Sequence, residues 1–129
     1  MMEYNSWDLE KAARRVSRGL STKVLSRIQK GLDLSNGELA EVVGIPVRTL
    51  SRRRTQKILS LTESERTLRI ARLMERAIEV LGGAEEGKAW MKRSNYSLNG
   101  RTPLEVAMTE PGVEIVRQLL GRIEHGIPL

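Results

Sequence analysis

The sequence predicts an all-α protein in which a helical N-terminal part with a helix-turn-helix packs on a second helical part at the C-terminus. Two observations lead to this prediction. Ser, Thr, Gly and Pro residues divide nearly the whole chain into segments whose apolar residues recur at helical spacing. No segment alternates apolar and polar residues convincingly enough for a strand. We place the boundary between the parts near Ser60, which gives residues 1–60 and 61–129.

The composition limits the class of protein. Hydrophobic residues make up 40% of the 129 residues and aromatic residues 3%, without any Phe, so the core must consist of aliphatic side chains and Met. The absence of cysteine excludes disulfides, zinc fingers and thiol catalysis. No apolar run approaches the roughly 20 residues of a membrane span. The N-terminus lacks the apolar region of a secretion signal, so we expect a cytoplasmic protein.

Positive charge is confined to the first half of the chain. Residues 1–60 contain 12 Lys or Arg and 6 Asp or Glu, whereas residues 61–129 contain 10 of each, so the first half carries the whole net charge of +6. A basic half beside a neutral half favours a polyanion-binding module joined to something else. A basic balance also occurs in proteins that are simply soluble, and this alternative stays open.

The first two helices are marked by their flanking residues. Ser6 is predicted to cap a first helix that ends near Gly19, with Leu9, Ala13 and Val16 on its inner face. Ser21 is predicted to cap a second helix over residues 22–30, with Gly31 just past its end.

Residues 36–57 fit a helix-turn-helix. Ser35 caps a helix from about Asn36 to Val43, Gly44 takes the turn, where a positive φ is needed, and Pro46 begins a second helix that runs to about Lys57. A small core lies under the two helices and consists of Leu39, Val43, Ile45 and Leu50.

The second helix of this motif is the candidate DNA-reading element. Helical spacing gives it an outer face of four residues that would reach base edges in a major groove: Arg48, Ser51, Arg52 and Thr55. Three further residues are placed for phosphates: Thr49, Arg53 and Lys57. Between Glu41 and Glu63 there is no acidic residue that would repel DNA. An ordinary helical hairpin with a solvated basic face is the alternative.

The second half begins with a long apolar helix. Residues 62–65 form a capping box, and the helix is predicted to end at Leu81, before Gly82 and Gly83. Its charged residues form one stripe, and most of the remaining circumference over residues 68–81 is apolar. Such a helix is central to the fold or is shared with a second subunit, and we take it as part of a dimer interface.

Shorter helices follow. We expect a helix over residues 85–93 that carries Trp90, a loop over residues 94–101, and a helix that begins at a Thr102–Glu105 capping box with Pro103 in its first position. A last helix over residues 111–124 ends before Gly126 and Pro128.

Residues 90–129 read WMKRSNYSLNGRTPLEVAMTEPGVEIVRQLLGRIEHGIPL and closely resemble the toxin-binding domain of Xre/MbcA/ParS-type antitoxins. Residues 48–53, RTLSRR, are similar to the recognition-helix signature of that family, although Pro46 and Arg53 depart from the usual pattern. The resemblance implies the antitoxin of a type II toxin–antitoxin system of the RES–Xre kind. Its partner would be a RES-domain toxin that destroys NAD, and it would repress its own operon by binding operator DNA as a homodimer.

The resemblance also implies that the end of the chain approaches the toxin's active site. The expected toxin-binding residues are Leu98, Arg122, Glu124, His125, Gly126, Ile127, Pro128 and Leu129. Ile127 and Leu129 are apolar residues at a chain end with no obvious core to join, which suits insertion into a partner. Trp90 is better explained as packing under the neighbouring loop.

Catalysis is not expected. The single histidine, His125, lies near the chain end, where it is a poor anchor for a nucleophile–His pair, and no phosphate-binding Gly-rich loop or metal-ligand cluster is visible. We therefore expect no cofactor and no metal. The main alternative is a stand-alone helix-turn-helix regulator without a toxin partner. A nucleoid-type architectural protein would need a more evenly basic surface than the neutral second half offers.

Overall fold

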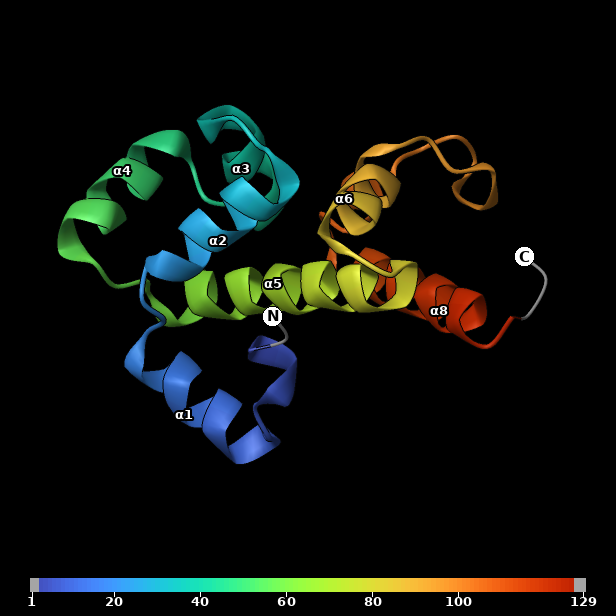
Figure 1. The fold of residues 1–129 in the computed structure, drawn as a ribbon. Coiled ribbons are helices and arrows are strands. Elements are labelled where there is room, and N and C mark those ends of the chain that lie inside the picture. Colours follow the sequence, from blue (N-terminus) through green and yellow to red (C-terminus); the bar gives the residue numbers. More distant parts are fainter. Residues whose placement is uncertain (1–2, 127–129) are drawn as a thin grey trace.

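The computed structural model describes residues 3–126, which form helices and connecting turns without a strand (Figure 1). An all-α fold is confirmed. In chain order the elements are η1 Tyr4–Ser6, α1 Leu9–Arg18, α2 Lys23–Leu32, α3 Asn36–Val43, α4 Val47–Gln56, α5 Leu61–Leu81, α6 Ala84–Lys92, η2 Tyr96–Leu98, α7 Pro103–Val106 and α8 Glu110–Glu124. An isolated bridge pairs Ser21 with Ile58 where the chain leaves α4.

Helix α5 is the centre of the molecule. It crosses Figure 1 from side to side, and α1, α2, α3, α6 and α8 all contact it. Leu68, Ile70, Ala71, Leu73, Met74 and Ala77 are buried, because the chain's own helices cover them. The predicted central place of this helix is thus confirmed. Most of the apolar face of residues 68–81 is covered within one chain, and only Ile78, Val80 and Leu81 are half-buried. The use of this helix in a dimer interface stays a prediction.

Several predicted helix ends shift to a neighbouring residue. Ser60, not Thr62, caps α5: its hydroxyl accepts from the Glu63 N–H, and the Glu63 carboxylate accepts from the Ser60 N–H. Two Ser/Thr-x-x-Glu patterns overlap here, and the upstream one is used. Asp8, not Ser6, caps α1, where Leu9 and Ala13 point to solvent and Ala12 is buried instead.

Gly31 lies inside α2 rather than past its end. The helix ends at Asp33, which adopts the left-handed conformation with φ 53°. A Cβ at Gly31 would lie 2.6 Å from the sulfur of Met74 on α5. The glycine therefore allows the close approach of α2 to α5, which is a reason that sequence spacing alone does not reveal.

The N-terminal turn η1 is fastened to α5 by a buried carboxylate. Glu75 is 2% exposed and accepts hydrogen bonds from the backbone N–H groups of Tyr4 and Asn5 at 3.1 and 2.9 Å. Arg72 donates to the carbonyls of Tyr4 and Trp7 at 3.0 and 3.2 Å. Because buried polar groups need hydrogen-bond partners, these bonds fix the position of η1 on α5.

Candidate nucleic-acid and protein interfaces

The predicted helix-turn-helix is confirmed as local structure. Ser35 and Glu38 form a capping box that begins α3, and Gly44 ends it with φ 68°. Leu39, Val43, Ile45 and Leu50 are all 2% exposed or less, so they form the core under α3 and α4 as expected. Ala40 is also buried, at 8%. The sequence folds this way because the left-handed turn at Gly44 lets α4 cross back over α3.

The outer face of α4 is basic and open. Arg48, Ser51, Arg52 and Thr55 are exposed, as is Lys57 at the end of the helix, and Thr49 is half-buried. Neither Arg48 nor Arg52 forms an ion pair with any of residues 3–126. Their guanidinium groups therefore remain available to an external anion.

Arg53 has a different place from the one expected. Its Nε lies 2.7 Å from Oε1 of Glu63, and its Nη1 donates to Gln56 at 3.0 Å. Burial alone would raise the pKa of Glu63, but the hydrogen bonds from Arg53 and Ser60 outweigh it and hold that pKa below its usual range. The Arg53 side chain thus links α4 to the start of α5, and its expected phosphate contact stays a prediction.

Arg54 is a functional candidate that the sequence reasoning missed. It donates from Nη2 to Gln29 on α2 at 2.7 Å and from Nη1 to Asn36 on α3 at 3.2 Å. Gln29 also donates to Asn36 at 2.9 Å. This network sets the position of α4 relative to both preceding helices. The available signal was helical spacing, since Arg54 lies four residues after buried Leu50 and on the same face.

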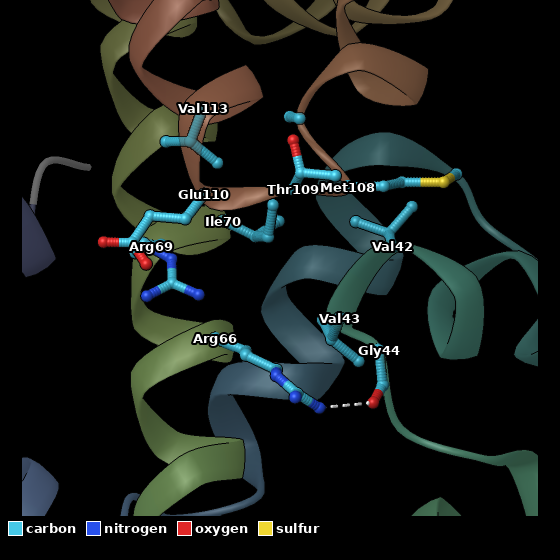
Figure 2. A pocket seen from close by; sticks show the side chains of 11 residues that line it. Val42, Val43, Gly44, Arg66, Arg69, Ile70, Met108, Thr109, Glu110 and Val113 are labelled. Atoms are coloured by element: carbon cyan, nitrogen blue, oxygen red, sulfur yellow. Dashed lines mark hydrogen bonds between the residues drawn. The ribbon is translucent and has the colours of Figure 1, made fainter.

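A cleft of about 420 Å³ separates the helix-turn-helix from the C-terminal helices (Figure 2). Arg66 of α5 crosses it and donates to the carbonyl of Gly44 at 2.9 Å. Figure 2 shows Thr109 and Met108, at the turn before α8, facing Val42 of α3 across the same space. Helix α5 thus forms one wall of this cleft and contacts both halves of the molecule.

The two large apolar residues near the second-half loop are buried. Trp90 is 7% exposed and belongs to the core, in keeping with a packing role. Leu98 is 6% exposed and belongs to the core, so its side chain offers little surface to a partner. Its expected contact with a toxin stays a prediction.

The end of α8 presents the remaining predicted residues. Arg122, His125 and Gly126 are exposed. Glu124 also reaches solvent, but both of its carboxylate oxygens accept from Arg76 of α5, with Nη1–Oε2 at 3.0 Å. These bonds hold the pKa of Glu124 below its usual range. The remaining predicted residues, Ile127, Pro128 and Leu129, lie outside the described part of the chain.

Tyr96 is the exposed residue that sequence reasoning passed over. Its side chain is 99% exposed at the start of η2, between half-buried Asn95 and exposed Ser97. A three-residue turn is too short to show a polarity pattern that would predict which of its side chains are exposed. The only available signal was that aromatic residues are rare in this chain, which makes Tyr96 unusual.

Residues 3–126 contain neither a membrane-spanning helix nor a cluster of metal ligands. None of the helices there is long and apolar enough to cross a membrane. In the same range no three His, Asp or Glu residues are grouped so that they could hold a metal ion.

Two family models match successive parts of the chain. Residues 76–126 match the model of the Antitoxin Xre/MbcA/ParS C-terminal toxin-binding domain, and residues 11–72 match that of the Antitoxin Xre-like helix-turn-helix domain. "Antitoxin Xre" of Yersinia enterocolitica is 36% identical over 115 residues, covering 87% of this chain and 77% of the relative. "Antitoxin Xre" of Photorhabdus laumondii is 35% identical over 114 residues, with the same coverage.

A solved structure shares the fold. A chain in the crystal structure of the M. tuberculosis MbcT-MbcA toxin-antitoxin complex superimposes with a TM-score of 0.62 at 17% identity, covering 84% of this chain and 96% of that one. At this identity the likeness concerns the arrangement of helices alone.

Proposed function

The chain belongs to the Xre family of antitoxins, which are not enzymes, and we propose that it neutralises a RES-domain, NAD-degrading toxin by blocking the toxin's active site. The match of residues 76–126 to a toxin-binding domain carries this proposal. Inhibition of this kind needs no chemistry from the antitoxin, because a bound chain excludes substrate from the active site. Since NAD and the operon are both cytoplasmic, we place the protein in the cytoplasm.

The surface at the end of α8 supports this proposal. Arg122, His125 and Gly126 are exposed there. The Arg76–Glu124 ion pair fastens the last turn of α8 to α5, so these residues leave the body of the molecule in a defined direction. Because the Arg76–Glu124 pair fixes the end of α8, the residues that follow Glu124 would lose less conformational entropy on binding a partner. Ile127, Pro128 and Leu129 complete the proposed toxin contact.

Co-expression with a RES-domain toxin, taken from beside this gene if one is encoded there, tests the proposal. We expect the full chain to restore growth and cellular NAD, and a chain ending before His125 to fail while remaining folded and soluble. A full-length R48A/R52A variant is the matched control, because its changes lie on α4 and should leave rescue intact. If the full chain is soluble and gives no rescue, a stand-alone helix-turn-helix regulator is the better interpretation.

We also propose that residues 1–60 bind operator DNA and repress the operon. The exposed, acid-free face of α4 supports this role, with Arg48 and Arg52 reaching base edges and Thr49 and Lys57 contacting phosphates. Fluorescence anisotropy with the DNA upstream of the operon measures the affinity. We expect binding that weakens steeply with salt and exceeds binding to a shuffled sequence of the same length. Equal affinity for both sequences would contradict operator recognition.

Repression of a palindromic operator would require a homodimer. Because most of the apolar face of α5 is buried within one chain, other surfaces are needed to complete the interface. Light scattering at micromolar concentration without toxin measures the mass, and a monomer under those conditions would count strongly against a dimer that forms before DNA is bound.

A further inference from the structure

We propose that Tyr96 anchors a second contact with the toxin, made by the 95–101 turn and separate from the tail at the end of α8. The inference rests on the proposed toxin-binding function and names a surface on which that function depends. The partner surface would be an apolar pocket of the toxin that accepts an aromatic ring and is bordered by carboxylates.

The exposure of Tyr96 sets it apart from the other aromatic residues. The chain contains two Tyr, two Trp and no Phe. Tyr4, Trp7 and Trp90 are 3%, 8% and 7% exposed, because the core uses each of them. Tyr96 is 99% exposed, so nothing in the described chain covers its ring. Exposed tyrosines that a partner buries are among the residues that contribute most to protein–protein affinity.

The turn that carries Tyr96 is held by hydrogen bonds and by one buried side chain. The Asn95 N–H donates to the carbonyl of Arg101 and the Gly100 N–H to the carbonyl of Asn95, both at 3.0 Å. The Asn95 side chain accepts from the Ser97 N–H at 2.9 Å, and buried Leu98 holds the turn against the core. The ring is thus presented on a fixed backbone, and little conformational entropy is lost on binding. A tyrosine without a role at the surface would not need a backbone held in this way.

The position of the turn fits one partner that also contacts the tail. In Figure 1 the turn, drawn in orange, and the end of α8 both lie at the end of α5 that is remote from the helix-turn-helix. Both belong to the segment that matches a toxin-binding domain. Arg93 and Arg101 flank the turn, are exposed, and form no ion pair with any of residues 3–126. Their charge favours acidic groups around the pocket that receives Tyr96.

Titration of the purified full-length chain against the RES-domain toxin tests the proposal. We expect Y96A to weaken binding at least about tenfold and Y96F to stay within about threefold of wild type, because the ring supplies most of the contact. Leu9→Ala is the matched control: Leu9 is 84% exposed on α1, outside the toxin-binding segment, and should bind like wild type. Tm and operator affinity should be the same for all four proteins.

The outcomes separate this inference from the function on which it rests. Wild-type affinity for Y96A would overturn the anchor and leave the antitoxin role intact. Equal losses for Y96A and L9A would also overturn it, because the effect would not be local to the turn. If the wild-type chain itself does not bind the toxin, the proposed function fails and the anchor fails with it. A chain that ends at Glu124 should still bind the toxin weakly. Loss of this remaining binding on addition of Y96A would establish two separate contacts.

Discussion

The two halves of the molecule offer different kinds of surface to their partners. Residues before Ser60 carry the whole net charge of +6 and expose it on α4, where Arg48 and Arg52 have no intramolecular partner in the described chain. Residues after Ser60 are neutral in sum, and the most exposed large hydrophobic side chain among residues 61–126 is the uncharged Tyr96. A polyanion can be attracted by charge over several ångströms, whereas a protein partner must match shape at contact.

This difference teaches that the two halves depend on their scaffolds in different ways. Long arginines on α4 can adjust to a phosphate or base, so small shifts of the helix are tolerated. The C-terminal surface depends on fixed elements, namely the 95–101 turn and the Arg76–Glu124 pair at the end of α8. Substitutions in the scaffold should therefore harm toxin binding more than DNA binding. The variants described next change either the scaffold or one of the two surfaces, from the largest expected effect to the smallest.

Gly112→Ala should have the largest effect. A Cβ there would lie 1.7 Å from the carbonyl oxygen of Val106, a backbone atom that cannot move aside. We expect the free energy of unfolding to fall by about 3 kcal/mol or more, measured by urea denaturation followed by circular dichroism. Gly121→Ala in the same helix meets nothing within 4 Å and should stabilise the protein by about 0.5–1 kcal/mol. Similar results for the two variants would refute the close contact.

The double variant R48A/R52A should separate the two activities. Loss of two base contacts of about 1–3 kcal/mol each predicts an operator affinity at least about 30-fold lower, with toxin binding unchanged. Arg122→Ala should show the reverse pattern, since it removes a similar charge from the end of α8. Anisotropy for DNA and calorimetry for toxin measure both. A parallel loss of both activities in either variant would show that the halves are not independent surfaces.

Glu63→Gln tests the link between α4 and α5 through its pH dependence. The folded-state pKa of Glu63 is lowered, so its carboxylate contributes stability above the unfolded value of about 4.3 and loses it as the pH falls through the folded pKa. We expect a loss of about 1 kcal/mol at pH 7 that shrinks towards zero below about pH 4. Gln keeps the capping box, so the charge alone is removed. Exposed Glu65→Gln is the control, and a pH-independent difference would exclude the ion pair as the cause.

Gly31→Ala should have the smallest effect. Its Cβ would meet the Met74 sulfur at 2.6 Å, but this thioether is flexible and can turn away. Alanine also gains up to about 1 kcal/mol of helix stability over glycine, so we expect a net change within about 1 kcal/mol in urea denaturation. In a Met74→Ala background, where the obstacle is absent, the same change should stabilise. If the free energy of unfolding fell as much as in Gly112→Ala, neither Met74 nor the two helices could move to make room for the added methyl group.

The sequence by itself determined the helices and the helix-turn-helix. Ser35, Gly44 and Pro103 act on backbone within a few residues of themselves, so their effects on helix starts and ends could be read directly from the chain. Overlapping signals limited this reading at Ser60 and Thr62, because both residues begin a valid capping box and only one is used. The all-α class and the acid-free basic face of α4 follow from the same local information.

Only the tertiary structure decided which of these residues face a partner. Leu98 and Tyr96 are two residues apart in one turn, yet one is buried and the other fully exposed, because the core that receives Leu98 comes from other elements. Arg53 turns to Glu63, and α5 is covered by helices from both ends of the chain. Exposure depends on contacts between residues distant in sequence, and local patterns of polarity and spacing carry no information about which of those contacts form.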